Sequence, residues 1–177
     1  MSTPLSRRNF LSRSAALAAA GATVGCGTTT RPADAMDQVE HIDGSIFAST
    51  WAFGRFANEE AQRTLASGSL LDAIEGGIRL VEADAENHSV GLGGTPNAGG
   101  VVELDACIMD GTTYNAGSVG GMTGIAHPIS VARRVMEKTK HVMLVGEGAR
   151  QFAIDEGLEA VDLLTEDRRQ KWEEWKK

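Results

Sequence analysis

Residues 91–124 read GLGGTPNAGGVVELDACIMDGTTYNAGSVGGMTG, and the rest of the predicted fold is arranged around this stretch. Residues 101–109 form a short, mostly apolar run bounded by glycine, which is typical of a buried strand. The pair Asp110-Gly111 follows directly and predicts a tight turn, because glycine accepts the positive φ that hairpin turns require. Residues 112–119 would then return as the partner strand. The stretch therefore predicts an antiparallel hairpin between two glycine-rich loops.

The segment before the hairpin has the pattern of helices. Asn58 and Ser69 are residue types that cap helix N-termini, and each precedes apolar residues at helical spacing. Gly76 and Gly77 lie inside the second run, where each glycine costs about 1 kcal/mol relative to alanine. Such a pair indicates the close approach of another element, which we expect to be the sheet. The expected elements are a strand over residues 44–53 and helices over residues 58–66 and 69–84.

More helices are expected after the hairpin. Pro128 suits the first turn of a helix, and Gly157 suits the C′ position that follows one. The last segment begins with acidic residues and ends with lysines, which matches the helix dipole. The expected elements are helices over residues 128–139, 147–156 and 165–177 and a short strand over residues 141–145.

Together these elements predict an α+β fold in which helices cover one face of a small sheet. Because a helix layer buries only one face, the other face and the sheet edge would stay open unless another segment covers them. No linker, low-complexity tract or internal repeat indicates a second domain. We therefore expect residues 36–177 to form one half of a larger fold.

Residues 1–35 are expected to direct export to the periplasm. Residues 6–11, SRRNFL, match a twin-arginine motif, and the apolar run over residues 15–24 is shorter than the roughly 20 residues of a membrane span. Residues 23–26, TVGC, resemble a lipoprotein box with threonine in place of the usual leucine, so Cys26 is the candidate for lipidation. Cleavage at residues 33–35, ADA, without a lipid anchor is the alternative.

Composition argues against several classes of protein. The net charge of −7 and the lack of a Lys/Arg cluster beyond the first 35 residues disfavour a nucleic-acid partner. Cys26 and Cys107 are the only cysteines, too few for a disulfide framework. We expect Cys107 to be a small buried residue of the first hairpin strand rather than a nucleophile.

The sequence contains no complete catalytic or metal-binding motif. The glycines of residues 91–94 lack the G-x-G-x-x-G spacing because Pro96 takes the third position, and neither H-E-x-x-H nor G-x-S-x-G occurs. Asp105 and Asp110 share the hairpin, but an odd spacing on a strand places them on opposite faces. We expect Asp110 to shape the turn and Asp105 to accept a hydrogen bond within the sheet. No metal or cofactor is expected.

A family resemblance rests on several sequence blocks in a fixed order. They are STW at 49–51, SLLDAIEGG at 69–77, VGLGGTP at 90–96, LDACIMDG at 104–111, VARRVME at 131–137 and VGEGA at 145–149. Together they resemble the N-terminal, α-subunit portion of the glycosylasparaginases, or N4-(β-N-acetylglucosaminyl)-L-asparaginases. The resemblance implies the N-terminal half of an αββα sandwich of the N-terminal-nucleophile (Ntn) hydrolase type. It also implies a precursor that cleaves itself before a threonine, whose freed α-amine, with a pKa of about 8, serves as base for its own hydroxyl.

The sequence departs from the family at one important point. The family's scissile sequence, His-Asp-Thr, does not occur in it. The nucleophilic threonine is therefore expected in a β segment beyond this chain, and the chain alone is expected to be inactive. The resemblance implies that α and β segments pair as a heterodimer, which pairs again as a dimer. The implied substrate of the complete enzyme is a glycoasparagine. The alternative to an enzymatic role is that the chain is a non-catalytic fragment or a glycan-binding remnant.

Four residues of the chain are carried over from the resemblance as site residues. Trp51 of the Ser-Thr-Trp block would line the substrate pocket, where an indole suits a sugar or amide; the alternative is an ordinary core tryptophan. Phe53 is the second candidate, and Gly93 and Gly94 would let the backbone approach the processing site. Plant-type asparaginases and isoaspartyl peptidases share the LDAxIMDG hairpin. The Ser-Thr-Trp block favours glycosylasparaginase over them.

Overall fold

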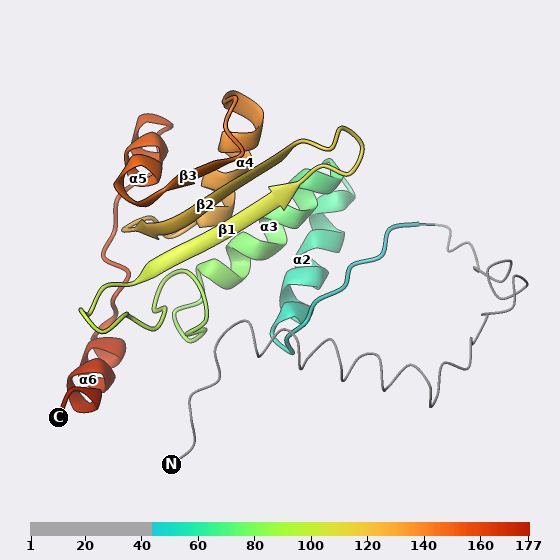
Figure 1. Ribbon diagram of the computed structural model, residues 1–177. Coiled ribbons are helices and arrows are strands. Elements are labelled where there is room, and N and C mark those ends of the chain that lie inside the picture. The colour runs from blue at the N-terminus through green and yellow to red at the C-terminus, as the bar shows by residue number, and fades with distance from the viewer. Residues whose placement is uncertain (1–43) are drawn as a thin grey trace, which may run out of the picture. The chain divides into compact units, whose positions relative to one another are not determined.

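The fold is built on a three-stranded sheet in the order β1-β2-β3 (Figure 1). The computed structural model describes residues 44–177, and Ile46–Lys177 form one compact unit. The first two strands are antiparallel and the third is parallel to the second. The predicted hairpin is thus confirmed, and the short strand downstream extends its sheet. The strands are β1 (Glu103–Met109), β2 (Ala116–Thr123) and β3 (Met143–Val145).

The register of the hairpin is interrupted near its glycine-rich end. The pairing of β1 with β2 shifts between Leu104 and Ala106, which leaves Asp105 without a direct partner across the ladder. The side chain of Asp105 compensates, because its Oδ1 accepts the backbone N–H of Gly121 at 2.7 Å. The expectation that Asp105 is hydrogen-bonded within the sheet is therefore confirmed.

The connection between β1 and β2 is longer than predicted. It spans residues 110–115, closed by the Asp110 N–H donating to the Asn115 carbonyl at 2.9 Å. Asp110 does shape it, since its Oδ1 accepts the Thr112 N–H at 2.9 Å and its Oδ2 accepts the Thr113 hydroxyl at 2.7 Å. These bonds, that of Thr113 first, lower the pKa of Asp110. The prediction of a two-residue turn was wrong, because the Asp110 carboxylate organises a wider loop. In that loop Tyr114, rather than a glycine, adopts a positive φ of 60°.

Five helices occur within residues 44–177, and most begin and end near their predicted positions. They are α2 (Gly54–Leu65), α3 (Leu70–Glu82), α4 (Pro128–Lys138), α5 (Gly146–Asp155) and α6 (Glu166–Trp175). The expected strand over residues 44–53 is wrong, because those residues form no strand. Asn58 does not cap α2, which begins at Gly54; its side chain instead accepts the hydroxyl of Ser49 at 2.7 Å and ties the preceding loop to the helix.

The start of α3 follows the prediction, whereas its glycine pair packs differently. Ser69 and Asp72 form a reciprocal capping box. Hydrogen bonds from Ser69 and then Arg133 lower the pKa of Asp72 to about 2. A Cβ on Gly77 would lie 2.4 Å from the carbonyl oxygen of Ala57 in α2, so the close neighbour of this glycine is a helix. The expectation that the sheet approaches it is wrong.

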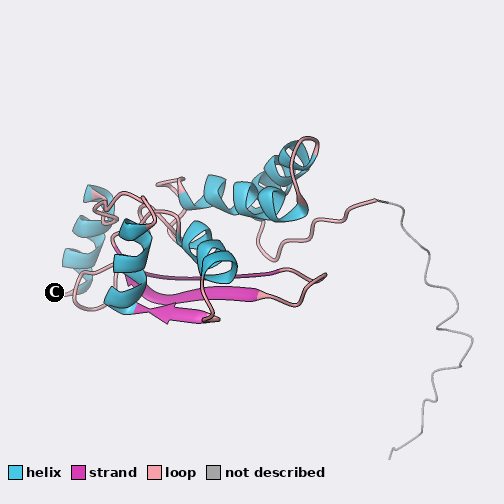
Figure 2. Cartoon of the chain, turned by 90° about the horizontal axis from the view of Figure 1, so that it is seen from above, coloured by secondary structure: helices cyan, strands magenta, loops and turns pink. Residues whose placement is uncertain are grey.

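The helices lie on one side of the sheet, as Figure 2 shows. Along β1 the exposed residues alternate with buried or half-buried ones, because successive side chains of a strand point to opposite faces. The helix-covered face contributes to a core shared with α4 and α5. Its buried members are Ile108, Val119, Met122, Ile125, Ile129, Val131, Ala132, Val135, Ala149 and Ala153.

The opposite face of β1 carries exposed side chains. These are Glu103, Asp105, Cys107 and Met109. The expected burial of Cys107 is therefore wrong within residues 44–177, and the reason is register, since this residue has the same parity as the solvent-facing Asp105. We call this four-residue stripe and its continuation over Met143 and Val145 the open sheet face; both of those residues are also exposed.

The predicted export segment, with its twin-arginine motif and Cys26, lies outside the described residues. In the part of the chain that the structure describes, no helix has the length and apolar character needed to cross a bilayer.

Candidate functional site

The glycine-rich loop before β1 is held by close packing. Gly93 has a φ of 77°, and its N–H donates to the carbonyl of Leu163 at 2.9 Å. A Cβ on the buried Gly94 would lie 3.0 Å from Cγ1 of Val102, so this loop lies directly against the chain entering β1. A side chain at either glycine would collide with its neighbours, so both glycines permit the close packing of this loop. That the approach serves a processing site stays a prediction.

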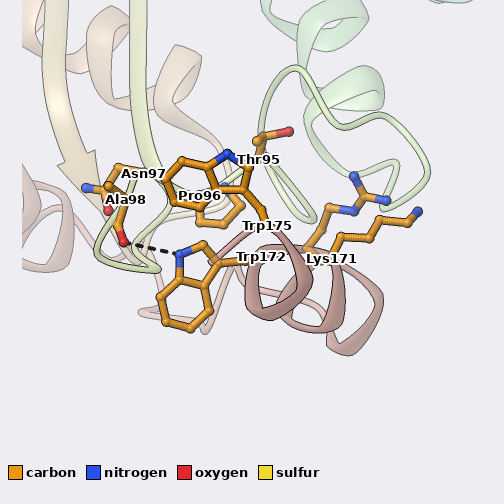
Figure 3. A pocket seen from close by; sticks show the side chains of 8 residues that line it. Thr95, Pro96, Asn97, Ala98, Lys171, Trp172 and Trp175 are labelled. Carbon is orange, nitrogen blue, oxygen red and sulfur yellow. Dashed lines mark hydrogen bonds between the residues drawn. The ribbon is translucent and has the colours of Figure 1, made fainter. Parts of the chain in front are cut away.

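A hollow of about 280 Å³ lies between this loop and α6 (Figure 3). We call it the α6 groove. Trp172 forms one side of it, and its Nε1–H donates to the carbonyl of Ala98 at 3.3 Å. The indole also covers Gly100, where a Cβ would lie 2.7 Å from the ring. The residues that line the groove are Thr95, Pro96, Asn97, Ala98, Arg168, Lys171, Trp172 and Trp175.

The polar side chains of the α6 groove are largely used by the protein itself. Asn97 accepts the N–H groups of Gly99 and Val101 at 2.9 and 3.1 Å and donates to Glu103 at 2.8 Å. Lys171 is bound to Asp167 at 3.0 Å. The groove therefore presents mainly apolar surface, and 69% of Trp175 is exposed at its rim. The sequence carried a signal for it, because the i, i+3 spacing of Trp172 and Trp175 puts both on one helix face.

The predicted substrate residues lie near the start of α2. Trp51 lies in the loop before α2 and is 69% exposed, so it is not a core residue of the described unit. Phe53 is half-buried and lines a separate hollow of about 340 Å³ between α2 and α3, together with Phe56 and Leu80. Phe53 therefore lines a different hollow from the α6 groove. The structure leaves the Trp51 indole free to contact another molecule or segment.

One buried acid links the end of α3 to the start of α4. Glu82 is 2% exposed; its Oε1 accepts the Ile129 N–H at 3.0 Å, and its Oε2 lies 3.2 Å from Nδ1 of His127. Burial raises the pKa of Glu82, and the bonds from His127 and Ile129 oppose that shift only in part. The pair joins two helices in the core, which indicates a structural role.

Residues 44–177 do not assemble a complete catalytic set. No serine, threonine or cysteine side chain in this range donates to a histidine ring, which is the pairing that activates such nucleophiles. No three histidine, cysteine or acidic side chains in the described range group as metal ligands do. The candidate contact surfaces of this part of the chain are the α6 groove, the exposed Trp51 and the open sheet face.

Comparison with known proteins finds sequence similarity along most of the chain. The model of the Asparaginase_2 family, described as asparaginase, matches residues 33–177. The chain is 55% identical over 133 residues to the N(4)-(Beta-N-acetylglucosaminyl)-L-asparaginase of Elizabethkingia miricola, covering 75% of this chain and 39% of that protein.

Relatives with other names are also similar. Identity is 49% over 115 residues to the plant-type L-asparaginase of Pyrococcus furiosus, covering 65% of this chain and 37% of that protein. It is 43% over 104 residues to the isoaspartyl peptidase of Salmonella typhimurium, covering 58% of this chain and 33% of that protein. The chain thus spans between a third and two fifths of the length of these curated relatives.

Proposed function

Because this chain belongs to the Asparaginase_2 family, we propose that it forms part of an amidohydrolase that cleaves the bond between N-acetylglucosamine and asparagine. The observation that carries the proposal is the 55% identity to an N(4)-(Beta-N-acetylglucosaminyl)-L-asparaginase over 133 residues. The identity to the plant-type L-asparaginase and the isoaspartyl peptidase is lower and covers less of the chain. The exposed Trp51 supports the proposal too, since an indole outside the core can contact a sugar.

The nucleophile is proposed to be an N-terminal threonine of a second segment that follows His-Asp, as the family resemblance implies. The threonine hydroxyl would attack the amide carbonyl while its own α-amine takes the proton, and that proton would leave with the glycosylamine. Water would then hydrolyse the aspartyl ester and release aspartate. An α-amine suits this task, because its ordinary pKa of about 8 lies near neutrality.

The open sheet face supports the proposal of a second segment. Met109, Met143 and Val145 are each more than half exposed there, at 54%, 54% and 60%. In an αββα sandwich, such a face packs against a second sheet at about 10 Å. We propose that the segment bearing the threonine supplies this sheet as the β subunit of an αβ heterodimer. Export by the twin-arginine route, with Cys26 as a lipid anchor, is proposed from the sequence alone.

The test is an assay of the complete polypeptide that carries this chain. Mass spectrometry should show cleavage before a threonine, and the enzyme should hydrolyse N-acetylglucosaminyl-asparagine with a higher kcat/KM than L-asparagine or a β-aspartyl dipeptide. A preference for L-asparagine or the dipeptide would replace the proposal by the second candidate, which the plant-type and isoaspartyl relatives favour. A polypeptide that neither cleaves itself nor hydrolyses any of the three would overturn both.

A further inference from the structure

The position of α6 depends mainly on one side chain, that of Trp172. No other helix or strand of residues 44–177 lies close to α6. Arg168 is the one buried residue of this helix, and its guanidinium is bound to Asp167 of the same helix. A helix of only ten residues is marginally stable by itself in water. The contact of Trp172 with the glycine-rich loop therefore decides where α6 lies.

The Trp172 indole and the turn over residues 97–101 fit each other closely. The indole N–H donates to the Ala98 carbonyl at 3.3 Å (Figure 3), and a Cβ on Gly100 would lie 2.7, 2.8 and 3.0 Å from three ring carbons. Gly100 also has a φ of 82°, so two separate constraints require glycine there. The Lys176 ammonium lies 4.3 Å from the centroid of the same ring and supports the indole from within α6.

The same turn is tied to the open sheet face by Asn97. Its Oδ1 accepts the N–H groups of Gly99 and Val101 at 2.9 and 3.1 Å, and its carbonyl accepts that of Gly100 at 2.9 Å. Its Nδ2 donates to Glu103 at 2.8 Å, and Glu103 is the first residue of β1 and of the open sheet face. The indole, the turn and the start of this face therefore form one continuous chain of contacts.

The segment that leads into α6 holds the other end of the glycine-rich loop. The Gly93 N–H donates to the Leu163 carbonyl at 2.9 Å, and Leu163 is buried in one small core with Val102. The loop is therefore held near its start by Leu163 and near its end by Trp172. A change in the position of α6 acts on the second of these two points.

We propose that Trp172 is a positioning residue of the proposed hydrolase, which sets the start of the open sheet face through the turn and thereby the rate of self-cleavage. The inference rests on the proposed function, in which the segment that bears the threonine packs on this face. Self-cleavage requires the reacting groups to be held in place, since a displacement of about 1 Å costs roughly a hundredfold in rate. Trp172 acts on the reaction only through the turn.

The experiment measures two quantities by mass spectrometry on the complete polypeptide: amide hydrogen exchange of residues 97–101 and the rate of cleavage before the threonine. We expect Trp172→Ala to speed the exchange and to slow cleavage, each by at least about tenfold, while exchange in β2 stays unchanged. Trp172→Phe keeps a ring on Gly100 but loses the bond to Ala98, so it should cleave at an intermediate rate. Glu173→Ala is the matched control on α6, because Glu173 is exposed and forms no salt bridge within the described residues.

Gly100→Ala tests the same contact from the side of the turn. It combines the strain of a positive φ with a collision against the indole, so it should slow cleavage as Trp172→Ala does. In the Trp172→Ala background the collision is gone, and the added effect of Gly100→Ala should shrink severalfold. Independent effects that simply multiply would show that the two residues do not act through each other.

The two readouts separate this inference from the proposed function. A wild-type polypeptide that does not cleave itself would overturn the proposed function, whereas the exchange data would still decide whether Trp172 holds the turn. The inference is overturned if Trp172→Ala leaves the exchange of residues 97–101 or the cleavage rate at the wild-type value. It is also overturned if Glu173→Ala slows cleavage as much. Thermal unfolding identifies a variant that fails to fold, and Trp172→Phe keeps the test decisive if Trp172→Ala does, because wild-type values of both quantities in it would contradict the inference.

Discussion

Gly77 in α3 and Ala57 in α2 are in backbone contact: a Cβ on the glycine would lie 2.4 Å from the alanine carbonyl oxygen. Real Cβ atoms do not approach a backbone oxygen that closely, so any side chain at position 77 must push the two helices apart. The contact explains why α3 keeps a glycine near its centre, where the residue costs about 1 kcal/mol relative to alanine.

We expect Gly77→Ala to destabilise the protein by about 2–3 kcal/mol, because overpacking against backbone cannot be relieved by a rotamer change. Gly148→Ala is the matched control. Gly148 lies in α5, where a Cβ would meet nothing within 4 Å, and the substitution should stabilise by about 0.5–1 kcal/mol. Chemical denaturation of both variants measures the two effects. Equal effects of the two substitutions would show that the helix contact is not tight.

Tyr114→Asn should stabilise the hairpin loop. Tyr114 adopts a φ of 60°, a conformation that costs a residue with a side chain roughly 1–2 kcal/mol and that asparagine tolerates better. The tyrosine is 78% exposed, so its removal loses little packing. We expect a gain of about 0.5–1 kcal/mol in the free energy of unfolding. The reciprocal control is Gly121→Ala, at a φ of 56° with open space around it, which should lose a similar amount.

The hairpin shows where sequence reasoning succeeds and where it stops. Asp110 could be recognised as a turn former because its chemistry acts on neighbours two and three residues away. The length of the loop could not, because it depends on the register of two strands and on a positive φ at Tyr114, a residue type that rarely adopts one. In the same way, Gly77 signalled a close contact but not its partner, since only tertiary structure places α2 there.

The candidate site, too, could be predicted only in part from the sequence. Trp51 could be singled out from a family motif, and its indole is exposed; that it lines a substrate pocket stays a prediction. The α6 groove was missed, because it needs a loop and a helix about 70 residues apart to meet, as the bond from Trp172 to Ala98 shows. Cys107 was misassigned because the bulge and register of β1 decide which side chains face the helices.

The buried Glu82 predicts a pH dependence of stability. Its pKa is raised above the ordinary value of 4.5 by burial, so the folded state holds this proton more tightly than the unfolded state does. The stabilising contribution is complete below pH 4.5 and is lost as the pH rises through the folded-state value. We therefore expect wild type to lose stability relative to Glu82→Gln as the pH rises from 4.5. The measurement is the difference in unfolding free energy between the two proteins at a series of pH values. A difference that stays constant, or that moves in favour of wild type, would contradict the assignment.

The reactivity of Cys107 tests the proposal that a second sheet covers the open sheet face. Its thiol is exposed within residues 44–177, so in a Cys26→Ser background the 177-residue chain should react readily with a maleimide. In the complete polypeptide the same thiol should react far more slowly until denaturant is added, because a packed sheet excludes the reagent. Rapid labelling of the folded complete polypeptide at Cys107 would show that the face stays open.

The last prediction concerns Trp51 and separates a role in the site from a role in folding. Because the indole is 69% exposed, Trp51→Ala should change the unfolding free energy by less than about 0.5 kcal/mol. In the complete enzyme the same variant should lower kcat/KM for N-acetylglucosaminyl-asparagine at least about tenfold, which corresponds to about 1.4 kcal/mol of lost transition-state stabilisation. Trp51→Phe, which keeps an aromatic face without the N–H, should retain an intermediate activity. Tyr114→Asn is the control, since Tyr114 is an exposed aromatic residue, at 78%, in the loop between β1 and β2. Loss of stability in Trp51→Ala, or an equal loss of activity in Tyr114→Asn, would remove the specific role proposed for Trp51.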